Sequence, residues 1–344
     1  MNCTPPAPFN YYDTPEFLSL SLHFITVIST PVHILGLYFL LYKTPERMES
    51  VKWHLVRLHG FIVLFDYVLA LFCIPMMLIP ELALLPLGLL SMLGVQASVQ
   101  MTLMVVSISF VIVSMVFVFE NRFFVICMFS WKHSWEAWRQ YWLYGHYVLL
   151  TIMLTPSIIL VPEQNVARHL VFKNLPCLSS YLYEAPIFVA TDSVISLIIL
   201  IFFVSITVSE DVLFTLFLIF NVFQQQKTGK MSRKTFNLQL KFLIALEFQM
   251  LAPTFLMLLP FSYLVYAILF RLYNQMINNF CVILISMHGS VSTLVMLMVH
   301  QPYRSALLGY FRRKAVVRSM IVPVQKPSDI SVIRNKNTLA VIND

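Results

Sequence analysis

Charged residues are scarce in this chain of 344 residues, and their scarcity excludes an ordinary soluble domain. Asp, Glu, Lys and Arg together make up 11% of the sequence, less than half the share of about 25% found in soluble domains. Apolar residues reach 59%, above the usual range of about 45–50%. This composition is typical of a membrane protein, so the chain length does not predict two soluble domains.

Motifs of catalysis are also missing. The sequence has no H-E-x-x-H zinc motif, no G-x-S-x-G nucleophile elbow and no phosphate-binding P-loop. We therefore expect a protein that is not an enzyme and that holds no cofactor or metal. Residues 276–299, the last apolar stretch, contain no Lys, which excludes a retinal Schiff base there.

Long apolar stretches are what the sequence does contain. A helix needs about 20 apolar residues to cross a hydrocarbon core about 30 Å thick. Backbone groups in lipid have to be hydrogen-bonded within their own segment, so such stretches are predicted to be helices. We predict an all-α membrane protein, a bundle of seven transmembrane helices, at residues 17–42, 55–80, 89–119, 142–162, 186–223, 242–264 and 276–299.

The fifth stretch, residues 186–223, is longer than one crossing requires. Glu210 and Asp211 interrupt it. Either the helix extends into the cytoplasm, or the two acids lie within the bilayer, where charge is costly. The sequence leaves both interpretations open.

Basic residues are distributed unevenly around these stretches. With the N-terminus outside, 20 of the 23 Lys and Arg residues lie in the cytoplasmic loops and tail, and Arg168, Lys173 and Arg271 lie outside. Since Lys and Arg favour the cytoplasmic side, the pattern predicts an N-out, C-in orientation. The net charge of +7 then reflects topology and contact with anionic membrane lipid, and we expect no nucleic-acid partner.

Three regions follow from this topology: an extracellular N-terminus (1–16), the seven-helix domain (17–304) and a cytoplasmic tail (305–344). The N-terminus has four Pro and no Lys or Arg, so we expect no cleavable signal peptide. Its Asn2 begins a glycosylation sequon. Residues 305–318 mix apolar and basic side chains, which predicts a short amphipathic helix on the inner leaflet, and the rest is expected to be disordered.

The five cysteines do not form a disulfide framework. Cys73 and Cys281 lie in apolar stretches, and Cys127 lies on the expected cytoplasmic side. Only Cys3 and Cys177 would meet oxidising conditions, so they could form one disulfide, or Cys177 could be a free thiol.

Polar residues inside the stretches are candidates for a switch. Asp66 is an acid within a span, which is costly and often functional. We expect it to form a polar hub, with Asn278, Asn279 and His288, that could hold an ion or water and bias two packings of the bundle. A hydrogen-bonded acid with a structural role alone is the alternative.

Glu120-Asn121-Arg122 marks the cytoplasmic end of the third stretch. Arg122 could pair with an adjacent acid at rest and turn towards a bound partner when the helices separate. Alternatively, the Arg122 side chain only extends its charged group to the polar edge of the membrane and has no role in a switch. Pro302 and Tyr303, after the seventh stretch, could mark a movable end or a simple helix terminator.

Motifs from about residue 17 to residue 304 resemble those of the nematode chemosensory seven-transmembrane receptors, most closely serpentine receptor class H. The matching residues are Pro31–Gly36, Lys43–Met48, Val51–Trp53, His59, Asp66, Phe119–Arg122, Gln249, Pro253, Asn274, Gln275, Asn278, Asn279, His288, Gly289 and His300–Arg304.

The resemblance implies a chemoreceptor at the plasma membrane of sensory neurons, in their cilia, coupled to a heterotrimeric G protein. Glu120-Asn121-Arg122 looks like the acid–Arg motif of rhodopsin-like receptors, and residues 300–304 occupy the place of their Asn-Pro…Tyr motif. The sequence departs from that pattern in two ways. Asn121 separates the acid from the Arg, and no Cys opens the third stretch to pair with Cys177.

We expect a small-molecule chemical cue to bind in the outer half of the bundle and the G protein to bind at the inner ends of the fifth and sixth helices. Polar or aromatic residues of the outer half are the candidate ligand contacts: Gln96, Gln100, Asp192 and Tyr263. Residues expected to serve coupling are Glu120, Asn121, Arg122, Lys230, Arg233, Lys234, Pro302, Tyr303 and Arg304. A seven-span channel or carrier subunit is the alternative, although no inverted repeat is evident. A structural or trafficking protein without a ligand is a third possibility.

Overall fold

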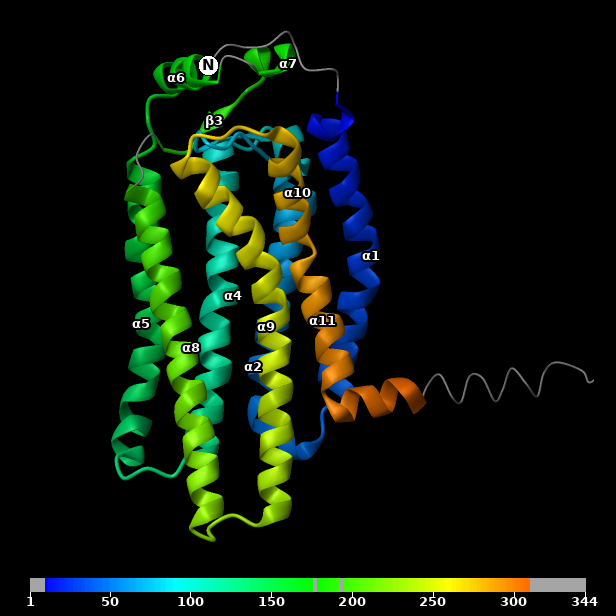
Figure 1. The fold of residues 1–344 in the computed structure, drawn as a ribbon, viewed down its shortest axis with the longest axis vertical. Helices are drawn as coiled ribbons and strands as arrows, with labels where there is room; N and C mark the ends of the chain where they lie inside the picture. The colour runs from blue at the N-terminus through cyan, green and yellow to red at the C-terminus, as the bar shows by residue number, and fades with distance from the viewer. Residues whose placement is uncertain (1–9, 176–177, 192–194, 310–344) are drawn as a thin grey trace, which may run out of the picture. The chain divides into compact units, whose positions relative to one another are not determined.

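A bundle of long helices with a small sheet at one end makes up the computed structural model (Figure 1). The structure describes residues 10–175, 178–191 and 195–309. The long helices are α1 (Pro15–Tyr42), α2 (Glu49–Tyr67), α4 (Ala97–Ile126), α5 (Lys132–Ile159), α8 (Ile195–Lys227), α9 (Arg233–Leu269), and the successive pair α10 (Gln275–Ser286) and α11 (His288–Val299).

Short elements connect the long helices. They are η1 (Tyr11–Asp13), η2 (Glu46–Met48), the π-helical segment η3 (Val68–Cys73), α3 (Leu89–Met92), α6 (Gln164–Asn174), α7 (Ser180–Glu184), and the strands β1 (Pro75–Met77), β2 (Ala83–Pro86) and β3 (Phe188–Val189). Residues 301–309 are helical as well. The tail from residue 310 onwards lies outside the described residues.

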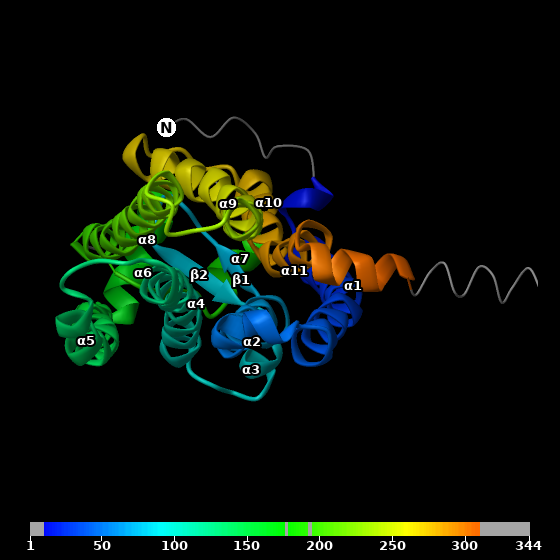
Figure 2. The ribbon, with the colours of Figure 1, turned by 90° about the horizontal axis from the view of Figure 1, so that it is seen from below.

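Six helical segments of the described chain are long and apolar enough to cross a membrane: Pro15–Tyr42, Glu49–Cys73, Ala97–Ile126, Ile201–Lys227, Arg233–Leu269 and Gln275–Val299. Helix α5, of 28 residues, corresponds to the predicted fourth stretch and is not among the six. It packs beside α4 and α8 through an apolar cluster that includes Phe117, Leu143 and Phe203. The view along the bundle shows α5 at its edge (Figure 2).

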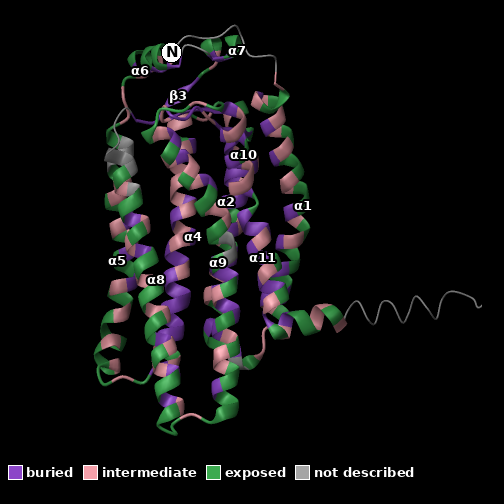
Figure 3. Ribbon diagram, in the orientation of Figure 1, coloured by how far each residue is buried: buried purple, intermediate pink, exposed green. Residues whose placement is uncertain are grey.

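Burial follows the helix faces that meet inside the bundle. Helix α4 packs against α2, α5 and α8, and Figure 3 shows buried residues along it. Large apolar side chains on outward faces are exposed, as Phe24 on α1 and Leu251 on α9 illustrate with 65% and 62% exposure. Exposed apolar side chains along several helices are what a lipid-facing surface requires.

The sheet is a departure from the predicted all-α fold. Its three strands are antiparallel in the order β1-β2-β3, with Met76 opposite Leu85 and Leu84 opposite Phe188. The predicted second helix, 55–80, therefore ends early, at Cys73. Ile74 has a left-handed backbone conformation (φ 42°), and Pro75 after it cannot donate a helical hydrogen bond. An apolar run alone does not distinguish a buried helix from a buried strand.

Apolar side chains fix the sheet to one end of the bundle, which we call the sheet end. Ile79 packs with Leu264 and Cys281 of α9 and α10. Leu84 and Phe188 pack with Met101 of α4. We call the opposite end, where α8 turns into α9, the turn end (Figure 1).

Amide side chains of α10 attach that helix to the neighbouring backbone at the sheet end. Asn278 Nδ2 donates to the Ile79 carbonyl at 3.1 Å, and Gln275 Nε2 donates to the Met77 carbonyl at 3.1 Å. Asn279 Nδ2 donates to the Tyr12 carbonyl at 2.9 Å. Burial raises the pKa of the Tyr273 phenol above its ordinary value, so its hydroxyl stays protonated and donates to Gln275 Oε1.

Asn278 and Asn279 do not contact Asp66, so the prediction that they join it in one hub is wrong. The break at Met287 divides the last span into two helices. Both asparagines lie on α10, on the sheet-end side of that break, where backbone carbonyls of β1, the turn after it and η1 need donors.

Replacing Asn278 with Ala should loosen the sheet end. The buried Ile79 carbonyl would lose its donor, at a cost of about 1–3 kcal/mol. We expect faster amide hydrogen exchange over residues 75–86, with unchanged exchange at the turn end. Asn165→Ala, at an exposed position of α6, is the control. Equal exchange in the two variants would contradict the role assigned to Asn278.

Candidate functional site

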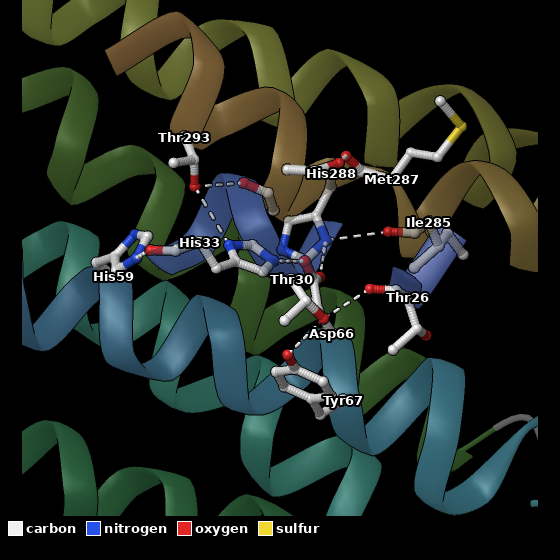
Figure 4. Close-up of polar contacts among 12 residues, drawn as sticks. Thr26, Thr30, His33, His59, Asp66, Tyr67, Ile285, Met287, His288 and Thr293 are labelled. Carbon is white, nitrogen blue, oxygen red and sulfur yellow. Dashed lines mark hydrogen bonds and ion pairs between the residues drawn. The ribbon is translucent and has the colours of Figure 1, made fainter. Parts of the chain in front are cut away.

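Asp66 on α2 is the centre of a polar cluster buried among α1, α2 and α11 (Figure 4). Its Oδ2 lies 2.9 Å from His33 Nε2 of α1, and its Oδ1 lies 3.1 Å from His288 Nδ1 of α11. The three side chains are 7%, 4% and 1% exposed. One carboxylate thus connects three helices, and a protonated imidazole on either side would balance its charge.

Two further side chains complete what we call the Asp66 cluster: Asp66, His33, His288, His59 and Thr293. His59 Nε2 lies 3.0 Å from the His33 carbonyl, and Thr293 Oγ1 lies 3.4 Å from His33 Nδ1. His288 Nδ1 also lies 3.0 Å from the carbonyl of Ile285. Of the residues expected in one polar hub, Asp66 and His288 lie together in the structure. Sequence reasoning missed His33 as a partner of Asp66 and His59 as a partner of the His33 carbonyl, although both lie in matching motifs.

Close helix approach around Asp66 depends on glycine. A Cβ atom at Gly289 would collide with the Asp66 carboxylate, and a Cβ atom at Gly36 would collide with Thr293. The helix break at Met287 also contributes, since it leaves the Ile285 carbonyl available to the His288 ring. Two glycines and a helix break therefore bring the acid and the imidazoles together.

A small cavity of about 10 Å³ adjoins the Asp66 cluster, with Thr26, Ser29, Tyr67 and Ser286 among its lining residues. That space is about enough for one water and too small for an organic ligand. Among the described residues, Ser29 Oγ has no hydrogen-bond partner, and Asp66 Oδ1 has only its ion-pair contact with His288. The chemistry of this place therefore suits a bound water rather than a chemical cue.

A second buried constellation, which we call the arginine site, lies towards the turn end on α4 and α9. Arg122 is 5% exposed, and its guanidinium lies over the Phe242 ring, 4.0 Å from the centroid. Within the described chain, its Nε and Nη2 have no hydrogen-bond partner. The cation–π contact is thus the main compensation that the structure gives to this buried charge.

Residues after α11 complete the arginine site. Phe242 lies beside His300, whose Nε2 is 2.8 Å from Gln249 Oε1. Tyr303 is fully buried, and its hydroxyl is 2.9 Å from Thr44 Oγ1, just after α1. Pro302 is partly buried and Arg304 is exposed, with Nη1 donating to the Met298 carbonyl at 3.3 Å.

Glu120 does not pair with Arg122, so that prediction is wrong. Its carboxylate accepts from Arg139 Nη2 at 2.6 Å and Nε at 3.0 Å, and from Trp135 Nε1 at 2.9 Å. Residues two apart on a helix point to different sides. Glu120 therefore faces α5 while Arg122 faces α9. Asn121 lies between them and is buried, with Oδ1 unpaired among the described residues.

The remaining predicted residues are dispersed. Lys230, Arg233 and Lys234 are exposed around the turn between α8 and α9. Gln96 is exposed before α4, whereas Gln100 is buried and donates to the Val95 carbonyl at 2.8 Å. Tyr263 packs in the separate cluster of Ile79 and Leu264. Asn2, Cys3, Cys177 and Asp192 lie outside the described residues.

Sequence reasoning also missed a contact between α5 and α8. His146 Nε2 lies 2.7 Å from Glu210 Oε2. An acid inside a long apolar stretch was the signal, but no sequence spacing links residues 64 positions apart. No group of three or more His, Cys, Asp or Glu side chains that could hold a metal occurs in the part of the chain that the structure describes.

Gly289→Ala should destabilise the protein. The added methyl group would push the Asp66 carboxylate away from its imidazoles, and such overpacking costs about 1–3 kcal/mol. Gly145→Ala, on α5 where a Cβ meets no atom within 4 Å, is the matched control and should be neutral or stabilising. Thermal unfolding of both purified variants tests this, and equal midpoints would argue against close packing at Gly289.

Arg139→Ala should also destabilise, because the fully buried Glu120 carboxylate would lose its ion pair at a cost of about 3–5 kcal/mol. The double variant Glu120→Gln/Arg139→Ala should recover part of that loss, since no charge is then left unpaired. Arg271→Ala serves as the control, because this pair with Glu81 is exposed and contributes about 0–1 kcal/mol. Additive effects in a thermal-unfolding cycle would refute the Glu120–Arg139 coupling.

The sequence of this chain is similar to that of a known protein family. The model of the serpentine type 7TM GPCR chemoreceptor Srh matches residues 13–313. Serpentine receptor class H-72 of Caenorhabditis elegans is 28% identical over 333 residues, which are 96% of this chain and 95% of that protein. The chain belongs to the Srh family of serpentine seven-transmembrane chemoreceptors.

Proposed function

We propose that this membrane protein is a chemosensory G-protein-coupled receptor that binds a small-molecule cue and activates a heterotrimeric G protein. Family membership supports the receptor class. The proposal places the protein in the plasma membrane of sensory neurons, in their cilia. The tail, residues 305–344, would lie in the cytoplasm beside the inner leaflet.

Seven crossings form the receptor in this proposal. Six come from the apolar helical segments, and α5 supplies the other, beside α4 and α8. The sheet end faces outside and the turn end faces the cytoplasm. Support comes from the basic residues: among those in the part of the chain that the structure describes, only Arg168, Lys173 and Arg271 lie at the sheet end or in its connections.

The observation that carries the coupling proposal is the state of Arg122. Its charge is buried against Phe242, and Glu120 is already bound by Arg139. Moving α9 away from α4 would remove the Phe242 ring and give the guanidinium nitrogens access to carbonyls of a partner. A ligand that favours this separated packing would shift the population towards it.

Exposed cations near the turn end fit the same partner. Lys230, Arg233 and Lys234 surround the turn between α8 and α9 and would attract an acidic surface. Tyr303 bridges the ends of α1 and α11 through Thr44, so its release would accompany helix separation. Arg304 completes the coupling set.

Ligand recognition is assigned to the sheet-end half of the bundle, with Gln96, Gln100, Asp192 and Tyr263 as candidate contacts. The Asp66 cluster lies where α1, α2 and α11 meet. It would act as the polar hub whose contacts differ between the resting and the active packing.

Arg122→Ala should abolish ligand-evoked signalling while preserving delivery to the cell surface. The experiment screens a panel of chemicals on cells that express the chain with a promiscuous Gα subunit, at matched surface levels. Arg271→Ala, at the sheet end with a 67% exposed side chain, is the control and should signal normally.

Undiminished signalling from Arg122→Ala would overturn the role of Arg122. A ligand-evoked current or substrate flux that persists without any Gα would instead support the alternative, a channel or carrier subunit.

A further inference from the structure

A groove of about 390 Å³ lies between α8 and α9, on the side of both helices nearer the turn end. Its size is within the range of about 300–1,000 Å³ typical of small-molecule sites. Its lining comes from these two helices alone and includes Ile219, Phe223, Leu243, Ile244 and Phe248. Phe223 and Phe248 are 49% and 55% exposed, so the groove opens to the outer surface of the bundle.

Glu247 is the one charged residue among those that line this α8–α9 groove. Its Oε1 accepts a hydrogen bond from Thr215 Oγ1 of α8 at 2.8 Å. In the described chain, Thr215 is the only donor to this carboxylate. A carboxylate can accept about four hydrogen bonds, so most of its capacity is unused.

A second acid lies beside the groove. Asp211 precedes Thr215 by one helical turn on the same face of α8, and it interacts electrostatically with Glu210 and Glu247. Its Oδ1 is buried and has no hydrogen-bond partner among the described residues. Glu210 is the only one of the three acids that the structure pairs with a basic side chain, His146.

We propose that the α8–α9 groove binds a long-chain amine, with its ammonium group at Glu247 and its alkyl chain along Phe223, Ile244 and Phe248. The ammonium brings three hydrogen-bond donors and a positive charge that can pair with the Glu247 carboxylate. The alkyl chain matches an apolar lining on a lipid-facing surface. The site lies outside the predicted ligand contacts of the sheet end, and binding there does not depend on G-protein coupling.

Other occupants match the groove less well. The acyl chain of a neutral lipid would leave the carboxylate without a counter-charge. A fatty acid would place a second carboxylate against Glu247. A long-chain alcohol could donate one hydrogen bond but would bring no charge, which makes it the discriminating comparison.

The test is photolabelling of the full-length protein in phosphatidylcholine nanodiscs at neutral pH. The probe is dodecylamine with a diazirine on its chain, and dodecanol with the same diazirine is the comparison. We expect saturable labelling by the amine within residues 219–223 and 240–251, and at least tenfold weaker labelling by the alcohol. Unlabelled dodecylamine should compete.

Glu247→Gln should lower the apparent affinity for the amine at least tenfold while keeping an acceptor for Thr215. Glu136→Gln, on an exposed position of α5, is the matched control and should bind as the parent does. Ile244→Trp keeps the carboxylate but fills the groove, so it should also reduce labelling. This second variant keeps the proposal testable if Glu247→Gln does not fold.

Three results would overturn the proposal. They are unchanged amine affinity in Glu247→Gln, equal affinity for the amine and the alcohol, and saturable labelling at other helices only. Loss of binding in Glu136→Gln as well would show a general effect of surface charge and would likewise reject the site. None of these readouts involves signalling, so failure here is distinct from failure of the proposed receptor function.

Discussion

A buried carboxylate with partners on two other helices is the constraint around which this bundle is arranged. Asp66 is buried inside the bundle, and its carboxylate depends on His33 and His288, which lie within hydrogen-bonding distance. Helices α1, α2 and α11 are consequently bound to one another by an interaction that none of them can replace from its own residues. The close approach at Gly36 and Gly289 is the steric condition for that interaction.

At the arginine site, too, buried charges need compensating partners, but the partners are different. Glu120 is neutralised by Arg139 from α5, so Arg122 is not needed as its counter-charge. The guanidinium then rests on an aromatic ring and leaves part of its donor capacity unused. An ion pair to the adjacent acid would hold Arg122 more firmly than a cation–π contact does. Arg122 is therefore a buried cation, near the turn end, that is held by a cation–π contact and, among the described residues, not by an ion pair.

Much of the architecture could be predicted from hydrophobic length alone, because lipid requires helices wherever a segment crosses it. The pairing of Asp66 with His288 was also within reach, since a buried acid needs a partner. The sheet was not, because apolar runs such as residues 74–86 suit a buried strand as well as a helix. The partner of Glu120 was missed because residue adjacency in sequence was taken for proximity, whereas helical geometry directs residues 120 and 122 to different sides.

Asn278 and Asn279 show a further limit of sequence reasoning. They lie in the same apolar stretch as His288, yet the break at Met287 places them in a different helix with different tasks. That break has a consequence for the molecule as a whole. The last span consists of two successive helices: α10 contacts the backbone of the sheet end, and α11 contacts Asp66. The sheet-end contacts and the Asp66 contacts are therefore made by different helices, so each set of residues is constrained by its own neighbours.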